Sequence, residues 1–298
     1  MDKSQGMPTV EWPASPTSRR PMPLSPLAVA VTRFGAVLRP DACDYEYVHQ
    51  AVPTSRDTPL AALSHPRENH FLAALPETEF ARWRSHLEPC DMPFGKVLME
   101  ARCECTHAYF PTTSIISMLY LTENGESVET AVAGYEGIVG LPLMMNGSLA
   151  PGRAVVRSAG YGFRLDASWF MQEFERSRPV QQLVLRYSQA FLTQTAQTAV
   201  CNRYHSLEQQ LCRWLLMSLD RLPTNEILAT QELIASTLGV RREGITAAAI
   251  RLQDAGFIAY RRGHISVLDR AGLERSACEC YGVVKQQFED VRPEALAA

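Results

Sequence analysis

The charged residues best suited to specific chemistry are Arg241, Arg242 and Glu243, which stand in succession at the start of a segment with helical apolar spacing. Side chains in the first turn of a helix reach base edges when that helix enters the major groove of DNA. Arginine can donate two hydrogen bonds to guanine O6 and N7, and glutamate can accept one from cytosine N4. Thr246, one turn further on, is a candidate for a base or phosphate contact. This run predicts a DNA-reading helix; the alternative is a solvated helix start with an Arg–Glu pair.

A second pair of arginines, Arg261 and Arg262, lies at the centre of a predicted hairpin. Apolar residues alternate with other residues over 258–260 and again over 265–267, which is the period of a strand. Guanidinium groups at a hairpin tip suit phosphates, which position a protein on DNA without reading its sequence. Between residues 229 and 270, six arginines stand against four acids, so any excess of positive charge is local. The hairpin is therefore predicted to be a wing.

The run Arg241-Arg242-Glu243 must be positioned by two helices joined by a tight turn. Thr230 is a suitable N-cap for the first helix, and Gly239 lies where a tight turn requires a positive φ. The second helix is expected from about Arg241 to Ala255. Two helices joined by a glycine-containing turn form a helix-turn-helix. Their predicted inward-facing residues are Leu233, Ile234, Leu238, Ile245, Ala248, Ala249 and Leu252.

Residues 88–165 indicate a different kind of structure. They form eight or so short strand-like segments separated by turns, which is typical of a small barrel or roll. One turn, at residues 123–125, predicts a hairpin between strands at 117–122 and 128–132.

A long helix is expected after this roll, from about Pro179 to His205, because proline fits the first turn of a helix. Residues that recur at intervals of three and four predict a dimer seam along it; the alternative is a helix packed on its own roll. The residues assigned to the seam are Leu183, Tyr187, Ala190, Gln194, Gln197 and Cys201.

The order of these parts resembles the cAMP receptor protein/fumarate-nitrate regulator (Crp/Fnr) superfamily over roughly residues 66–290. The resemblance is strongest in TQELIASTLGVRREGITAAAIRLQDAGFIAYRRGHISVL, residues 230–268. It implies a homodimer that binds double-stranded DNA and works with RNA polymerase. It also implies that Thr230 and Gln231 meet phosphates, that Arg241, Arg242 and Glu243 read the half-site, and that a further basic reader of the family is replaced by Ala247.

The sensor roll departs from this family's cyclic-nucleotide cassette. The resemblance places a Gly-Glu pair and a later Arg-Ser/Thr-Ala in the roll, to hold the ribose and the cyclic phosphate. Here Gly140 is followed by Leu141, and Arg153 is followed by Ala154. Without the carboxylate acceptor the ribose loses a hydrogen bond, which costs about 1–3 kcal/mol. Gly140 and Arg153 remain the candidates for a ligand or anion site, but we expect another small-molecule effector, or none, rather than cAMP.

The cysteines are scattered, and we expect no metal site and no cofactor. Cys103 and Cys105 are expected on one strand of the roll, where both side chains would share a face and permit metal or redox chemistry. Cys278 and Cys280 are expected on a terminal helix, where they would diverge by about 200°. The interpretation we favour for both pairs is packing residues. The histidines show no paired ligand spacing.

Composition excludes several classes of protein. A formal net charge of −3 argues against a protein that coats nucleic acid without sequence preference. A DNA-binding site on this chain must therefore be a local basic surface. The 8 cysteines follow no secretion signal that we recognise, which favours a cytoplasmic location. Residues 19–38 resemble a twin-arginine export signal, but two prolines and Arg33 argue against it. No apolar run is long enough to span a membrane.

The sequence therefore predicts an α+β chain: a cyclic-nucleotide-binding-like β-roll, a long dimerisation helix and a C-terminal winged helix-turn-helix. The expected parts are a loosely ordered extension at 1–65, the roll at 66–178, the helix at 179–205 and the DNA-binding domain at 206–291. No enzyme motif, such as a phosphate-cradling loop or a nucleophile elbow, is recognised. The alternative function is a signalling module that docks a protein through a degenerate helix-turn-helix, which would have no reason to keep charges on both helix and wing.

Overall fold

A computed structural model describes residues 65–124, 126–145 and 149–292. The chain divides into two compact units, residues 1–38 and 39–298, and every described residue belongs to the second. The predictions for residues 1–64, including the extension and the export-like segment, lie outside the described residues. Within the described part, no helix is long and apolar enough to cross a membrane.

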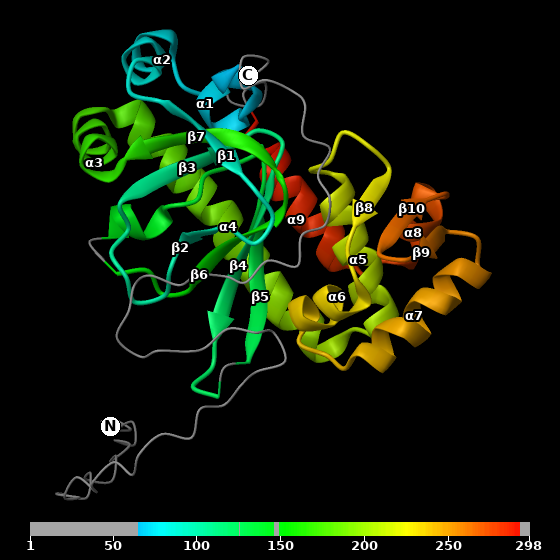
Figure 1. Cartoon of the computed structure of the whole chain (residues 1–298). Helices are drawn as coiled ribbons and strands as arrows, with labels where there is room; N and C mark the ends of the chain where they lie inside the picture. Colours follow the sequence, from blue (N-terminus) through cyan, green and yellow to red (C-terminus); the bar gives the residue numbers. More distant parts are fainter. Residues whose placement is uncertain (1–64, 125, 146–148, 293–298) are drawn as a thin grey trace, which may run out of the picture. The chain divides into compact units, whose positions relative to one another are not determined.

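Seven short strands form the roll, in two antiparallel sheets of order β1-β7-β3 and β2-β6-β4-β5 (Figure 1). The predicted hairpin is confirmed, because β4 pairs with β5 from Ile116↔Ala133 to Leu121↔Ser127. The strands of the roll are β1 (Glu88–Met92), β2 (Val97–Met99), β3 (His107–Pro111), β4 (Ile115–Leu121), β5 (Ser127–Ala133), β6 (Arg153–Ser158) and β7 (Gly160–Asp166).

Short helices pack against one end of the roll around an aromatic core. Trp83, Phe110 and Phe170 are fully buried there, and Trp83 meets both phenyl rings edge-on. The helix that contributes Phe170 was not predicted; Asp166 caps it by accepting from the backbone N–H of Ser168 and Trp169. These elements are η2 (Pro66–Glu68), α1 (His70–Ala73), α2 (Glu77–Arg84), α3 (Ala167–Arg176) and the turn η3 (Leu141–Met145).

The long helix α4 (Arg178–Tyr204) follows the roll, close to its predicted bounds. Five of the six residues predicted to form its dimer seam are instead packed inside this chain, so the prediction is wrong for those five. Gln194, for example, donates through Nε2 to the carbonyl of Val132 at 3.0 Å and accepts its N–H at 3.1 Å. Gln197 is only half-buried. The fully packed members, each at most 5% exposed, are Leu183, Tyr187, Ala190, Gln194 and Cys201.

The C-terminal part begins at Ser206, which caps α5 in a reciprocal capping box with Gln209. A three-stranded sheet of order β8-β10-β9 and four further helices follow, and together they form the predicted winged helix-turn-helix. The elements are α5 (Leu207–Leu219), β8 (Glu226–Leu228), α6 (Gln231–Leu238), α7 (Arg242–Asp254), β9 (Ile258–Arg261), β10 (His264–Val267), α8 (Arg270–Ser276) and α9 (Glu279–Glu289).

Candidate nucleic-acid interface

The first helix of the helix-turn-helix, α6, is fixed at both ends by its own sequence. Thr230 accepts the backbone N–H of Leu233 through its side chain at 3.1 Å. Gly239 adopts φ +66°, which an L residue reaches only with strain. The N–H groups of Gly239 and Val240 then bond back to Ser236 and Ala235, which ends the helix and turns the chain. Both the predicted cap and the predicted positive φ are confirmed.

The second helix, α7, begins with the three charged residues that the sequence singled out. Arg241 is its N-cap residue, and Arg242 and Glu243 form its first turn; all three side chains are exposed. Thr246 is differently placed: its hydroxyl lies 2.7 Å from Gln231 Oε1 and 3.1 Å from the carbonyl of Arg242. Thr246 therefore ties α7 to α6, and its hydroxyl is already engaged within the domain.

The hairpin between β9 and β10 is tight, as the sequence predicts. Arg262 (φ +52°) and Gly263 (φ +83°) both have left-handed backbone conformations, which is the geometry of a two-residue type I′ turn. Tyr260 holds the hairpin down: its hydroxyl donates to the carbonyl of Ala229 at 2.8 Å, and its N–H bonds Gln253 Oε1 at 2.8 Å. Arg261 and Arg262 are both exposed at the tip.

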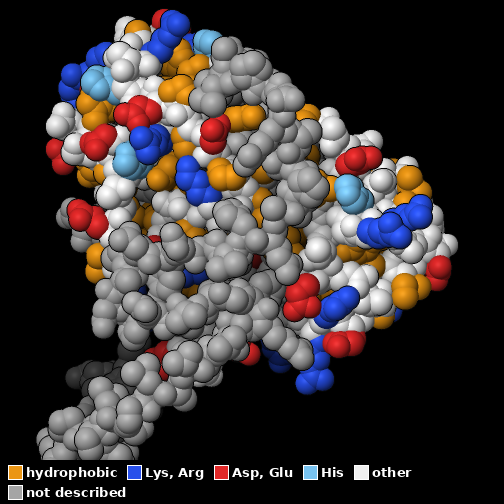
Figure 2. Space-filling view, in the orientation of Figure 1, with side chains coloured by type: hydrophobic (Ala, Val, Ile, Leu, Met, Phe, Trp, Pro, Cys, Tyr) orange, Lys and Arg blue, Asp and Glu red, His pale blue; other side chains and the backbone are white. Residues whose placement is uncertain are grey.

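The hairpin tip and the start of α6 lie side by side. The N–H of Ala229 donates to the carbonyl of Gly263 at 2.9 Å, and a Cβ at Gly263 would lie 3.7 Å from Thr230 Cγ2. Thr230 and Gln231 therefore border the same surface as Arg261 and Arg262. Lys and Arg side chains gather over the region of β9 and β10 in Figure 2.

Four of the six arginines between residues 229 and 270 form no ion pair with a described carboxylate. Arg251 pairs with Glu208 at 2.6 Å, and Arg270 pairs with Asp220 and Glu274. In the part of the chain that the structure describes, no carboxylate lies within ion-pair distance of Arg241, Arg242, Arg261 or Arg262. Unpaired, exposed guanidinium groups on a helix start and on a wing can donate to phosphate and base acceptors together.

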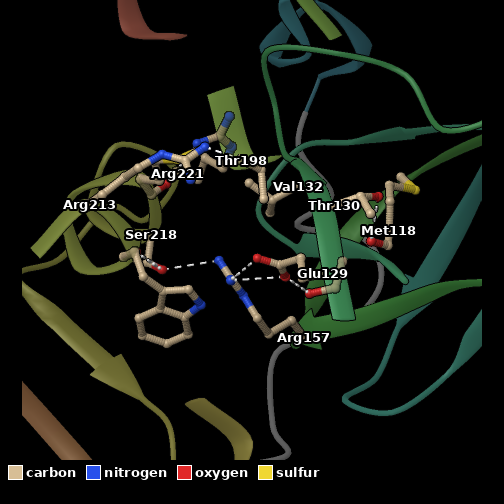
Figure 3. Close-up of polar contacts among 12 residues, drawn as sticks. Met118, Glu129, Thr130, Val132, Arg157, Thr198, Arg213, Ser218 and Arg221 are labelled. Atoms are coloured by element: carbon tan, nitrogen blue, oxygen red, sulfur yellow. Dashed lines mark hydrogen bonds and ion pairs between the residues drawn. The ribbon is translucent and has the colours of Figure 1, made fainter. Parts of the chain in front are cut away.

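Arg157, which forms an ion pair inside the roll, also connects the roll to the C-terminal part, and sequence reasoning missed this contact. Arg157 of β6 lies 3.2 Å from Glu129 of β5 and donates to Ser218 Oγ of α5 at 3.0 Å (Figure 3). Ser117 also donates to Glu129. Burial lowers the pKa of the Arg157 guanidinium, and the Glu129 charge opposes that shift. No pattern in the sequence marks this group, because Glu129, Arg157 and Ser218 come from three separate elements, β5, β6 and α5.

A second buried pair makes a similar connection. Arg221, just after α5, lies 2.6 Å from Glu136 of the roll and donates to the carbonyl of Met217 at 2.8 Å. Tyr135 of the roll also contacts the C-terminal part, because its hydroxyl donates to the carbonyl of Asp220 at 2.8 Å. The helix α6 also packs on β5. The position of the helix-turn-helix therefore depends on the roll.

The two residues proposed for a ligand or anion site both make contacts within the roll. Arg153 lies 2.9 Å from Glu100, and both side chains are about nine-tenths buried, so its charge is compensated within the roll. Gly140 is buried with φ +136°, and a Cβ there would lie 3.1 Å from Ala108 Cα. Close backbone packing therefore explains why position 140 is a glycine.

The cysteine pairs also differ from expectation. Cys103 and Cys105 lie outside the strands, in the segment between β2 and β3, and Cys105 donates toward Met99 Sδ at 3.2 Å. The shared strand face predicted for them is therefore wrong. At the other end of the chain, Cys278 is the N-cap of α9 rather than part of it, so the predicted divergence from Cys280 is wrong as well.

These two C-terminal cysteines meet residues from the end of α4. Cys278 Sγ lies 3.6 Å from Cys201 Sγ, and Cys280 Sγ lies 3.5 Å from His205 Nδ1. The hydrogen bond with Cys201 lowers the pKa of the Cys278 thiol to about 5, against the effect of burial. Sequence reasoning placed Cys201 in the dimer seam and overlooked that Cys201 and His205 are four residues apart, on one face of a helix end.

Comparison with known proteins agrees with this architecture. Residues 209–276 match the family model of the Crp-like helix-turn-helix domain. A protein from Eubacterium rectale assigned to the Crp/Fnr family of transcriptional regulators has a TM-score of 0.57 at 18% identity, over 70% of this chain and 98% of the other. No match to a curated protein was found.

Two further solved structures share the fold. FixK2 from Bradyrhizobium japonicum gives a TM-score of 0.55 at 13% identity, covering 64% of this chain and 98% of its own. The c-di-GMP-responsive global regulator CLP of Xanthomonas campestris gives 0.53 at 13% identity, covering 65% and 100%. The C-terminal segment is therefore a Crp-like helix-turn-helix domain, and the chain has the fold of Crp/Fnr-type transcription regulators. The resemblance inferred from the sequence is confirmed.

Proposed function

We propose that this protein is a sequence-specific DNA-binding transcription regulator. The observation that carries the proposal is the set of four exposed, unpaired arginines, Arg241, Arg242, Arg261 and Arg262, on the helix start and the wing of a Crp-like domain. In this proposal Arg241, Arg242 and Glu243 read base edges in the major groove, while Arg261 and Arg262 contact phosphates.

Thr230 and Gln231 take a supporting role in this proposal. They border the wing tip at the start of α6, where a helix N-terminus favours a phosphate. Thr246 is assigned to positioning, since its hydroxyl already joins α7 to Gln231.

The proposed regulator is a homodimer that pairs through the outer face of α4. This helix has 27 residues and is about 40 Å long. Leu185 and Leu192 are 64% and 57% exposed, and they are seven residues apart, so they share one stripe with Ala196 and Val200. Apolar side chains repeated at heptad spacing on an unpacked helix face favour a coiled-coil contact.

The test of the dimer is a pair of charge substitutions on that stripe. We expect the native chain to sediment as a dimer and Leu185→Glu/Leu192→Glu to sediment as a monomer. Leu268→Glu, which alters an equally exposed leucine in the C-terminal part, should remain dimeric. A native monomer, or a doubly substituted chain that stays dimeric, would contradict the proposed interface.

The test of DNA reading is selection of bound duplexes from a random pool by the purified protein, followed by sequencing. A dimer whose α7 helices enter successive major grooves should enrich a two-fold symmetric site with half-sites about 10 base pairs apart. Enrichment without symmetry would contradict the dimeric model, and no enrichment under any small-molecule addition would contradict DNA reading.

We further propose that signals at the roll reach α6 and α7 through the buried contacts described above. Since Arg153 is already paired with Glu100, and Leu141 stands where the resemblance implies a ribose-binding acid, the effector is not cAMP. Added cAMP should leave the affinity for the selected site unchanged. RNA polymerase is the expected partner at a promoter, and a slower-migrating complex of polymerase, protein and promoter DNA would support that contact.

A further inference from the structure

Four metal-binding side chains converge where the end of α4 meets the start of α9. Cys201 is in the last turn of α4, and His205 is its C-cap residue. Cys278 is the N-cap residue of α9, and Cys280 is in the first turn. Their ligand atoms all lie within 4.8 Å of one another, and three of the four residues are buried.

We propose that Cys201, His205, Cys278 and Cys280 bind one Zn²⁺ ion in a Cys₃His site that joins the long helix to the C-terminal helix. The proposal does not depend on the proposed function, because it concerns metal binding by the chain itself. It departs from the expectation, drawn from the sequence, that the chain has no metal site.

The spacing of the ligand atoms matches a single tetrahedral ion. With Zn–S of about 2.3 Å and Zn–N of about 2.0–2.1 Å, the edges of a tetrahedron are about 3.8 Å for S···S and about 3.6 Å for S···N. The Cys201–Cys278 Sγ distance is 3.6 Å, and the Cys280 Sγ–His205 Nδ1 distance is 3.5 Å. Three thiolates and one imidazole form a soft, structural zinc ligand set.

Other uses of these thiols fit the geometry less well. A disulfide requires an S–S distance of about 2.05 Å, and 3.6 Å between Cys201 and Cys278 is much longer. An iron–sulfur cluster contains several iron and sulfide atoms, so its ligands must stand further apart than around one ion. A simple packing cluster would have no need of the imidazole of His205, whose Nδ1 faces the sulfur of Cys280.

The residues around the four ligands orient them. His205 Nε2 lies 3.3 Å from a carboxylate oxygen of Glu279, so Nδ1 is left free to bind the metal. Metal-bound histidines typically donate their other ring N–H to such a carboxylate. Gln210 Nε2 donates to the carbonyl of His205 at 3.0 Å and lies 3.4 Å from that of Cys201, which holds both ligands in place.

The electrostatics of the location also favour thiolates. Three thiolates and one Zn²⁺ leave a net charge of −1, which needs a nearby positive charge. The buried guanidinium of Arg213, which bonds Thr198 Oγ1 at 2.9 Å, lies near Cys201 and supplies it. The N-terminus of α9 adds a favourable dipole at Cys278.

Zinc at this position would fasten α9 to α4. The segment between His205 and Cys278 contains the whole helix-turn-helix and its wing. An ion held by both ends of that segment closes it into a loop, which fixes the DNA-binding domain to the helix proposed for dimerisation. Metal affinity then contributes to the folding free energy of the domain.

The experiment uses the full chain, purified under reducing conditions from zinc-supplemented cells. Elemental analysis should find about one zinc per chain. After removal of zinc, titration with Co²⁺ should give intense visible bands of tetrahedral cobalt with thiolate charge-transfer absorption. Cys278→Ser and His205→Ala should each lower the zinc content several-fold, whereas Cys212→Ser should leave it unchanged, because Cys212 is an equally buried free thiol outside the set.

A thiol-blocking reagent added to the native chain provides a measurement that does not depend on the folding of a variant. Release of zinc in step with modification of three cysteines, identified by mass spectrometry as Cys201, Cys278 and Cys280, supports the site. Absence of zinc together with octahedral or no cobalt binding overturns it, as does iron and sulfide in place of zinc. Loss of DNA binding without loss of zinc would count against the proposed function alone.

Discussion

Arginines in two regions of this molecule have opposite surroundings. In the roll and beside it, Arg157 and Arg221 are buried and Arg153 is nearly so, and each is paired with a glutamate. At the helix start and wing of the C-terminal domain, the arginines are exposed, and no described carboxylate pairs with them. The same side chain is therefore used once to hold parts of the chain together and once to present charge to a partner.

This difference shows why composition alone is a poor guide to the site. A buried arginine loses its hydration and must be compensated within the fold, so it has no charge left for a ligand. An exposed, unpaired arginine keeps its charge available, and a cluster of them creates a local positive surface on a chain whose net charge is −3. The contrast can be tested by substituting one arginine at a time.

The largest effect is expected at Arg157. Arg157→Met leaves Glu129 buried without its partner, and breaking such a pair costs about 3–5 kcal/mol in the free energy of unfolding. Urea denaturation of the native and substituted chains measures it. The double change Arg157→Met/Glu129→Leu should recover most of the loss. If the single change were neutral, the division between buried and exposed arginines would not hold.

The next largest effect is expected at Arg242. Arg242→Ala should weaken binding to the selected DNA site by about 1–3 kcal/mol, because the variant cannot make the two hydrogen bonds to a base. The free energy of unfolding should change by less than about 0.5 kcal/mol, since the side chain is exposed and unpaired. Fluorescence anisotropy with labelled duplex, beside urea denaturation, separates the two. A variant that is destabilised but binds normally would reverse the assignment.

A smaller, sequence-independent effect is expected at the wing. Arg261→Gln/Arg262→Gln should weaken binding to all duplexes alike and reduce the steepness of the salt dependence by about 1 for each phosphate that the variant no longer neutralises. Affinities measured over a range of salt concentrations give that slope. An unchanged slope would remove the wing from the proposed interface.

The smallest effect is expected at Arg251, which belongs to the same domain but is paired with Glu208 at the surface. Arg251→Gln should change the free energy of unfolding by about 0–1 kcal/mol, the range of exposed ion pairs. Its DNA affinity should equal that of the native chain. A decrease in affinity as large as that of Arg242→Ala would show that surface pairing does not decide which arginines meet DNA.

The local features of the C-terminal domain could be predicted from the sequence. The cap at Thr230, the positive φ at Gly239 and the tight turn at Arg262-Gly263 are set by residues close to them in the chain. The hairpin between β4 and β5 is local in the same way.

Features that join segments distant in the chain could not be predicted from the sequence. Apolar residues recur every seven positions on two opposite faces of α4, so the spacing alone does not show which face is buried. The position of the roll decides that Tyr187 lies inward and Leu192 outward. The pair formed by Arg157 and Glu129, and the meeting of Cys201 with Cys278, depend on tertiary contacts that no spacing encodes. Cys278 is the N-cap residue of α9 and not inside that helix, so the angle expected between two helical residues does not apply to it.

The most direct test of the central claim is to run the random-pool selection in parallel with the native protein and with Arg242→Ala. The native dimer should enrich a two-fold symmetric site, and the variant should lose its preference at one position in each half-site while keeping the rest. If both proteins enriched the same sequence with the same preference at every position, Arg242 would not read DNA, and the helix start of α7 would not be the reading site.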